Sequence, residues 1–252
     1  MRSVKKNIKA NFDKSAKNYD ENSHIQKNIS NYLHLMLKDN KELIKFRENC
    51  FGLDLGCGTG EFSERISETI KLKKIHLIDI SDQMIERAKK KITGKNISFE
   101  IIDFEEFNDF QKFNFIFSNM SLHWSDDFYG LLKNISEKIL VNTILLFSFP
   151  NSSSFEYFKN YNDSKKKMTN NFPDTKIFLK LLDKKKFVLK HKEIIVNKSY
   201  NGPLKFFLDL KKIGANTCIK DKHYKLFDLR KNKSRVNINF NVSCLFIKKI
   251  KK

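Results

Sequence analysis

The sequence predicts an α/β fold in which a mostly parallel sheet of seven strands is covered by helices on both faces. Three observations support this prediction. Short apolar runs alternate with amphipathic stretches, a glycine-rich turn follows the first of these runs, and acidic residues end three successive runs. Alternation at this spacing is typical of a parallel sheet buried on both sides. At 252 residues the chain is long enough for one such domain with an appendage.

Helices and strands are expected in a regular order through the first 150 residues. Apolar residues at helical spacing predict two helices between positions 4 and 38, separated at Asp20–Asn22. Short apolar runs predict strands at Cys50–Leu55, Lys74–Ile80, Ile97–Ile102, Phe113–Ser118 and Thr143–Phe149. The amphipathic stretches between them predict helices at Glu61–Thr69, Asp82–Lys91 and Asp126–Lys138.

The periodicity is weaker after Pro150. It predicts helices at Asn151–Tyr161, Thr175–Leu182 and Leu204–Ile213, and strands at Phe187–Val196 and Val236–Ile247. These last two strands, joined through Gly202–Pro203 and a helix, would complete the seven-stranded sheet. We therefore expect a single domain over residues 1–252. Its parts are an N-terminal helical cap (1–40), a cofactor-binding core (50–150), an inserted lid (151–186), and C-terminal strands with a helix (187–252).

The most informative segment reads LDLGCGTGEF, at Leu53–Phe62, between a predicted strand and a predicted helix. Its turn contains Gly56, Cys57, Gly58 and Gly60. Glycine lets the backbone turn sharply and approach a ligand, and the following helix offers unpaired N–H groups. Asp54, two positions before the first glycine, suits a cationic ligand better than a phosphate. The loop resembles that of class I methyltransferases, whose ligand carries a sulfonium and an amino-acid end; the resemblance implies S-adenosylmethionine.

Two more acids end the next two predicted strands. Asp79, with Ile80 beside it, is placed to accept hydrogen bonds from adjacent ribose hydroxyls. Asp103 is placed to accept from an adenine amino group while Phe104 or its neighbour packs on the ring. Each acid alone would also fit a solvated strand end. Together with Asp54 they lie at three successive carboxyl ends, where open α/β sheets bind ligands, and they indicate a binding site.

A narrower resemblance comes from three other segments. SNMSLHW at Ser118–Trp124 resembles a segment of the malonyl-acyl carrier protein O-methyltransferases of biotin synthesis. FDKSAKNYD at Phe12–Asp20, with Gln26 after it, resembles the opening of that family, and LKKIGAN at Leu210–Asn216 resembles its later LKxIGA segment. The resemblance covers about residues 8 to 218 and implies a Rossmann-like class I methyltransferase fold.

The resemblance also implies a reaction and roles for individual residues. The acceptor would be the free carboxylate of malonyl-acyl carrier protein, methylated at the start of pimelate-moiety synthesis for biotin. Such a carboxylate, with a pKa near ~4, is ionised at neutral pH and needs no general base. A buried carboxylate needs a cation, and motif grounds favour Lys211. Tyr19 would either bond to the cofactor or anchor the N-terminal helix, and main-chain groups of Ser118 and Asn119 would face the methionine moiety.

Several features depart from the pattern or leave alternatives open. Asn114 stands where this superfamily usually has an aspartate, and the turn before the fifth strand is short, with Asn142 as its left-handed residue. The strand-end His123 reads as a wall residue rather than a base. Rival acceptors are another small acid of the aconitate type, or the protein arginine modified by complex I assembly relatives that share SLHW. A nucleic-acid-binding module is a third alternative.

The net charge of +20 has two interpretations, a bias toward lysine in composition or a surface selected for an acidic partner. The second would fit acyl carrier protein, with contacts at Lys165–Lys167, Lys211, Lys212 and Lys220–Lys225. Nucleic acid is not an expected partner, because SNMS replaces the N/D-P-P-Y/F motif of base-amino methyltransferases. The apolar runs are too short for a membrane span, and the cysteines lack metal-site spacing. We expect a cytoplasmic monomer without a secretory signal or a bound metal.

Overall fold

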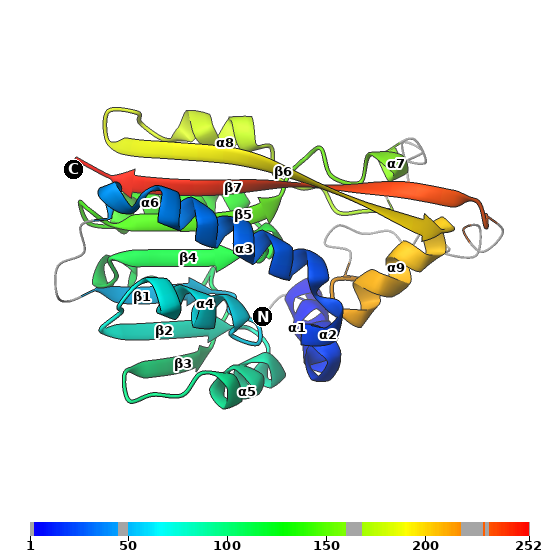
Figure 1. Ribbon diagram of the computed structural model, residues 1–252, viewed down its shortest axis with the longest axis horizontal. Helices are drawn as coiled ribbons and strands as arrows, with labels where there is room; N and C mark the ends of the chain where they lie inside the picture. Colours follow the sequence, from blue (N-terminus) through cyan, green and yellow to red (C-terminus); the bar gives the residue numbers. More distant parts are fainter. Residues whose placement is uncertain (1–2, 45–49, 160–167, 218–228, 230–231, 252) are drawn as a thin grey trace.

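The computed structural model describes residues 3–44, 50–159, 168–217, 229 and 232–251, and its seven-stranded sheet confirms the predicted fold class (Figure 1). The order across the sheet is β3-β2-β1-β4-β5-β7-β6. The first five strands are parallel, whereas β7 runs antiparallel to both β5 and β6. The strands are β1 (Phe51–Leu55), β2 (Lys74–Asp79), β3 (Ile97–Ile101), β4 (Phe115–Asn119), β5 (Ile144–Pro150), β6 (Phe187–Asn201) and β7 (Arg235–Lys249).

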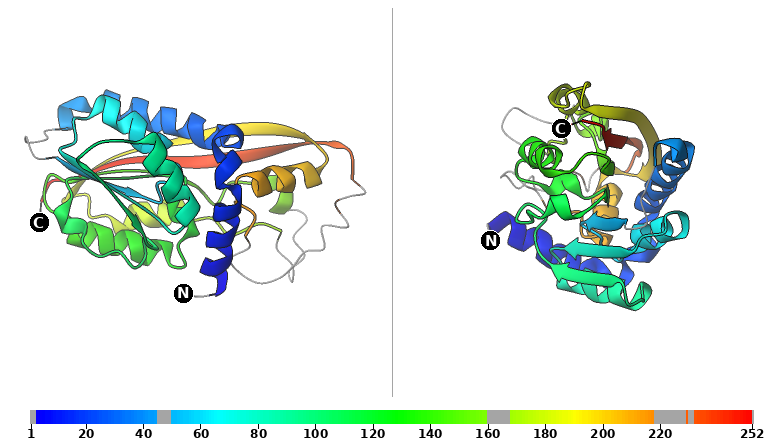
Figure 2. Two further views of the ribbon diagram at one scale, coloured as in Figure 1. Left: turned by 90° about the horizontal axis from the view of Figure 1, so that it is seen from below. Right: turned by 90° about the vertical axis from the view of Figure 1, so that its left-hand side faces the viewer.

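Helices cover both faces of this sheet (Figure 2). One face packs against α3 (His24–Asp39), α4 (Glu61–Thr69) and α5 (Asp82–Lys91), whose buried side chains share one core cluster with β4 and β5. The other packs against α6 (Phe128–Lys138) and α8 (Thr175–Leu181) in a second cluster. Neighbouring residues of β4 alternate between the clusters: Phe115 and Phe117 join the first, Ile116 the second.

The N-terminal helices lie across the carboxyl ends of the parallel strands (Figure 1). They are α1 (Ser3–Ser15) and α2 (Tyr19–Asn22), joined by a 3₁₀ turn, and α2 contacts α9 (Pro203–Lys212). The predicted break at Asp20–Asn22 is wrong, because these residues are helical and the chain turns at Ser23 instead. A hydrogen bond of 2.7 Å between the Asn11 amide and the Thr217 hydroxyl ties the N-terminal segment to the end of the α9 segment.

Two other elements differ in length from the sequence prediction. The predicted helix at Asn151–Tyr161 is only α7 (Glu156–Lys159) in the described residues, because Asn151 and Ser154 bond to β7 instead of continuing a helix. Strand β6 extends to Asn201 because it pairs with β7 along fifteen residues. The left-handed conformation expected of Asn142 is confirmed, with φ of 73°.

An aromatic cluster fixes α9 against the long antiparallel pair of strands β6 and β7. Phe206 is fully buried at its centre, with ring centroids 4.8 Å from Phe155, 5.0 Å from Phe158 and 5.9 Å from Phe240. Edge-to-face and tilted aromatic pairs at such distances add to the effect of burial itself. This cluster therefore holds the C-terminal helix in place beside the N-terminal cap.

Replacing Phe206 with alanine is expected to lower the free energy of unfolding by about 3–5 kcal/mol, because the change leaves a cavity inside the cluster. Urea unfolding followed by circular dichroism measures this loss. The matched control is Leu208→Ala on the same helix; Leu208 is 42% exposed, so its truncation should change stability by about 0.5 kcal/mol or less. Equal destabilisation by both changes would contradict the packing role.

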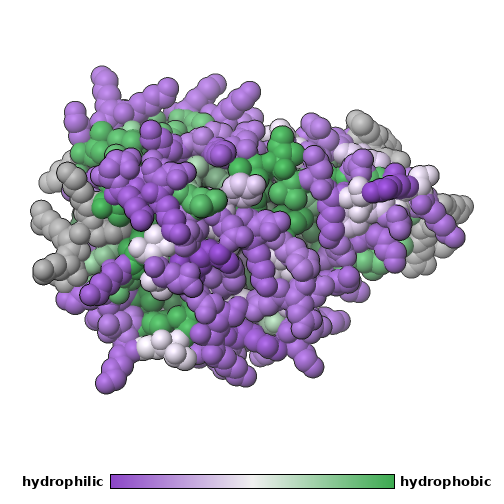
Figure 3. Space-filling model, in the orientation of Figure 1, coloured by the Kyte–Doolittle hydropathy of each residue, from purple (hydrophilic) through white to green (hydrophobic). Residues whose placement is uncertain are grey.

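The surface is mostly hydrophilic, with small apolar patches on the face shown in Figure 3. Exposed apolar side chains include Tyr32 and Leu35 on α3 and Ile195 on β6. Among the described residues, no helix is both long enough and apolar enough to cross a membrane. Within the same residues, no group of three His, Cys, Asp or Glu side chains is arranged to hold a metal ion.

Candidate active site

The glycine loop between β1 and α4 forms the floor of the site. Gly56, Gly58 and Gly60 have φ angles of 72°, 55° and 83°, a region that side-chain-bearing residues rarely adopt. The N–H groups of Gly56 and Cys57 both donate to the Ile78 carbonyl at 2.9 Å, which fixes the loop to the end of β2. The loop is thus held open above the sheet, with α4 beginning directly after it.

Beside this loop lie the first two acids of the site, of which Asp54 is buried and Asp79 half-buried. Asp54 is 1% exposed and accepts a hydrogen bond of 2.5 Å from the Ser63 hydroxyl. Asp79 accepts from the N–H groups of Gly58 (2.9 Å) and Ser81 (2.8 Å). Burial is the main cause that raises the pKa of Asp54 to about 7 and that of Asp79 to about 6. Two carboxylates poorly solvated in this way favour a cationic or hydrogen-bond-donating ligand.

The third acid has a partner that sequence reasoning missed. Lys5 of α1 is buried, and its ammonium lies 3.1 Å from Asp103, 2.5 Å from Glu105 and 5.3 Å from the centre of the Phe104 ring. The expected acceptor for an adenine amino group therefore already pairs with a lysine of the cap. Only the helical spacing around Lys5 in the sequence hinted at its position, and that spacing does not identify a charged residue as buried.

Two cavities open side by side over the loop. The first spans about 560 Å³ and the second about 420 Å³, and both volumes include space open to solvent. They share Tyr19, Gly56, Gly58 and Asn119 as lining residues. The first also contacts Lys5, Ile8, Phe12, Asp79, Ile80, Met84, Asp103, Phe104, Met120, Ser121 and Trp124. The second also contacts Asp20, Ser23, Gln26, Lys27, Asp54, Cys57, Thr59, Glu61 and Phe62. We call them the apolar-end and the acidic-end cavity.

Most of the residues predicted for the site line these cavities, and three do not. Ser118 is buried and its hydroxyl donates to the Leu55 carbonyl at 2.7 Å. Gly60 packs against α5, where an added Cβ would lie 2.7 Å from Ile92. Lys211 is exposed on α9 and contacts neither cavity, so its role over the methyl group stays a prediction. Lys165–Lys167 and Lys220–Lys225 lie outside the described residues.

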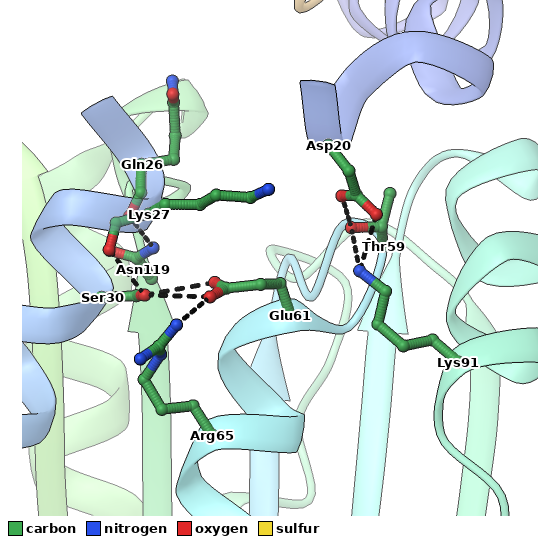
Figure 4. Close-up of polar contacts among 9 residues, drawn as sticks. All are labelled: Asp20, Gln26, Lys27, Ser30, Thr59, Glu61, Arg65, Lys91 and Asn119. Atoms are coloured by element: carbon green, nitrogen blue, oxygen red, sulfur yellow. Dashed lines mark hydrogen bonds and ion pairs between the residues drawn. The ribbon is translucent and has the colours of Figure 1, made fainter. Parts of the chain in front are cut away.

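The cavities are partly covered by the N-terminal helices rather than by the described part of the 151–186 segment. Tyr19 lines both cavities, and burial raises the pKa of its phenol, which is therefore neutral at physiological pH. Asp20 accepts hydrogen bonds from the Thr59 hydroxyl (2.5 Å) and the Lys91 ammonium (2.7 Å), which ties α2 to the glycine loop and α5 (Figure 4). None of the described residues of 151–186 lines either cavity.

The ends of β4 and β5 complete the wall. The Asn119 amide donates to the Gln26 carbonyl at 3.0 Å and accepts from the Ser148 hydroxyl at 2.7 Å, which joins α3 to both strands. His123 packs between Trp124 and Phe172, with ring centroids 5.1 and 5.7 Å away. Burial lowers the pKa of His123 to about 3, so it is neutral and cannot act as a cation. It lines neither cavity, so its ring serves packing between Trp124 and Phe172 rather than contact with a ligand.

Comparison with known proteins identifies the family. A family model described as a methyltransferase domain matches residues 46–224. A malonyl-[acyl-carrier protein] O-methyltransferase 2 of Ilyobacter polytropus is 32% identical over 85% of this chain and 82% of its own. The chain belongs to this methyltransferase family. A second relative of the same name, from Coxiella burnetii, is 26% identical over 99% of this chain and 98% of its own.

A solved structure supports the fold of this methyltransferase. The plantazolicin methyltransferase BpumL in complex with S-adenosylhomocysteine (SAH) superposes with a TM-score of 0.55 at 16% identity, covering all of both chains. The methyl donor of the family is S-adenosylmethionine, and the residues present fit it. Carboxylates at the acidic end suit an ammonium, Asp79 suits ribose hydroxyls, and Ile80 and Phe104 offer apolar surface for a purine.

Proposed function

We propose that this methyltransferase methylates the free carboxylate of malonyl-acyl carrier protein, the step that starts pimelate-moiety synthesis for biotin. The observation that carries the proposal is the near-full-length similarity to enzymes of that name, beginning with the relative from Ilyobacter polytropus. The geometry supports it, because the site has an intact glycine loop and a neutral Tyr19, and no histidine is among the described residues that line the two cavities. A carboxylate acceptor needs no base, whereas most amine or hydroxyl acceptors do.

In the proposed reaction, the chain acts by binding and orienting. When bound, S-adenosylmethionine supplies an electrophilic methyl group. Asp79 would hold the ribose, Asp54 and the acidic end the ammonium, and Tyr19 would lie over the junction of the two cavities, near the methyl. Alignment of a bound carboxylate with the methyl, in a site partly covered by the N-terminal helices, can supply roughly 7–11 kcal/mol in favourable cases.

The product gives the proposal chemical sense. A methyl ester removes the negative charge at the end of the acyl chain, so that the chain can enter apolar pockets of fatty-acid synthesis enzymes. The basic surface would steer an acidic carrier protein. We further propose that the chain acts as a cytoplasmic monomer. The described cysteines support a reducing compartment, because Cys50, Cys57 and Cys244 are free and buried.

The test is methyl transfer from S-adenosylmethionine labelled in its methyl group to malonyl-acyl carrier protein, with malonyl-CoA and free malonate alongside. We expect label in a base-labile ester, with the highest kcat/KM for the carrier-bound substrate. Acetyl-acyl carrier protein, which lacks the free carboxylate, is the matched control and should stay unlabelled. Binding of SAH without transfer to any malonyl compound would assign the acceptor to another small acid or to a protein side chain.

A further inference from the structure

The acidic-end cavity is lined by more acidic than basic side chains. Asp20, Asp54 and Glu61 line it, and Lys27 is its single lysine among the described lining residues. Asp54 is buried and already accepts the Ser63 hydroxyl. Such a cavity suits the ammonium of an amino acid, but a free amino acid also carries a carboxylate. A carboxylate taken out of water into this cavity is costly unless a cation of its own receives it.

The other cations around the cavities are already paired. Lys91 lies 2.7 Å from Asp20, Arg65 lies 2.6 Å from Glu61, and Lys5 lies 2.5 Å from Glu105. Lys27 differs, because none of the ion pairs between described residues includes it. Figure 4 shows its side chain extending from α3 into the space between Glu61 and Asp20, with no dashed line to either acid. The half-buried Lys27 therefore faces the cavity without an ion pair to any described carboxylate, and Asp20 is its electrostatic neighbour.

The backbone of Lys27 is held firmly in this position. Its N–H donates to the Ser23 carbonyl at 3.0 Å, and the carbonyl of the preceding Gln26 accepts from Asn119 at 3.0 Å. Two residues further along α3, Ile29 is fully buried against the sheet. The hydroxyl of Ser30 donates to Glu61 at 3.1 Å. The cation is thus mounted on a rigid helix that is tied to the end of β4, as a pre-organised binding group requires.

We propose that Lys27 binds a ligand carboxylate at the acidic end of the site. Within the proposed function, on which this inference rests, two carboxylates reach the site: the α-carboxylate of the cofactor and the malonyl carboxylate of the acceptor. The cavity favours the cofactor α-carboxylate, because it also offers the Asp54 carboxylate for the ammonium bonded to the same α-carbon. The cavity then offers a carboxylate for the ligand ammonium and the Lys27 ammonium for the ligand carboxylate, as a zwitterionic amino-acid group requires.

The experiment compares two ligands that differ only at the amino-acid end. Isothermal titration calorimetry measures the affinity for SAH, which has both the ammonium and the carboxylate, and for 5′-methylthioadenosine, which has neither. Lys27→Met should weaken SAH roughly 10- to 100-fold, the effect of losing a charge-assisted hydrogen bond, and leave 5′-methylthioadenosine within about twofold. Lys27→Arg should retain most of the affinity. Lys38→Met, an exposed lysine of the same helix, is the matched control and should change neither affinity.

A kinetic arm distinguishes the source of the carboxylate. If SAH affinity is unchanged in Lys27→Met but KM for malonyl-acyl carrier protein rises at constant KM for S-adenosylmethionine, Lys27 binds the acceptor carboxylate instead. Equal weakening of both calorimetric ligands, or no change in any of these quantities, would overturn the proposal. SAH binding does not depend on the acceptor. The calorimetric experiment therefore still tests the role of Lys27 if no methyl is transferred to malonyl-acyl carrier protein.

Discussion

Replacing Gly56 with alanine is expected to weaken SAH binding by roughly 100-fold or more. A Cβ at this position would lie 1.8 Å from the Ser121 hydroxyl oxygen and 2.6 Å from the Ser121 Cβ, and the backbone has φ of 72°. Serine is too short to move away by rotation alone, so the loop must shift out of the cavity. Strain and displacement together cost about 3 kcal/mol, which corresponds to the expected loss. Calorimetry with SAH measures it.

A second variant distinguishes a local clash with Ser121 from a general loss of folding. In the double variant Gly56→Ala/Ser121→Gly the clash is removed and only the backbone strain persists. It should therefore bind SAH roughly tenfold more tightly than Gly56→Ala does. Thermal unfolding of all three proteins shows whether the fold is intact. If the double variant binds SAH no better than Gly56→Ala, contact with Ser121 does not explain the loss and the loop geometry described above is wrong.

The core of the fold was predictable because its signals are local. The bounds of α4 and α5 agree with the sequence prediction to the residue. The start of α5 is marked by Ser81, whose hydroxyl accepts from the Met84 N–H at 3.1 Å, and its end by a run of lysines. The prediction for β6 stopped short at Val196, because pairing with a strand some forty residues away does not show in the local pattern.

In the candidate site too, residues marked by a local pattern were predicted and residues placed by the tertiary fold were not. The loop and its acids were found because glycines and carboxylates at strand ends carry a recognisable spacing. Lys5 and Lys27 were missed, because in a chain with so many lysines nothing local distinguishes a lysine that faces a cavity from one on a solvated surface. Lys211 illustrates the reverse, since a motif favoured it while the structure places it on the exposed side of α9. Which lysine faces the ligand depends on how the cap folds over the sheet.

Asparagine in place of Asp54 is expected to weaken SAH binding about tenfold or more and to remove much of the pH dependence of that binding. In the free protein, burial raises the pKa of Asp54 to about 7, well above the ordinary value near ~4. Part of the population is therefore protonated at neutral pH. A ligand ammonium favours the ionised form, so ligand binding has to release that proton. The affinity of the wild-type protein for SAH should rise as pH increases from about 5.5 to about 7.5, and calorimetry across this range tests it.

The same raised pKa values predict the opposite trend for stability without ligand. Between about pH 4 and the folded pKa values near 6 and 7, the folded chain holds protons on Asp79 and Asp54 that the unfolded chain releases. The free energy of unfolding must therefore fall as pH rises through this window, and level off above it. Asp54→Asn should flatten this fall as well as the rise in affinity, while Asp39→Asn, at an exposed position of α3, should alter neither. Affinity that is independent of pH in the wild type would mean that Asp54 does not face the ligand's charge. A stability curve that rises with pH in this window would mean that other groups outweigh Asp54 and Asp79.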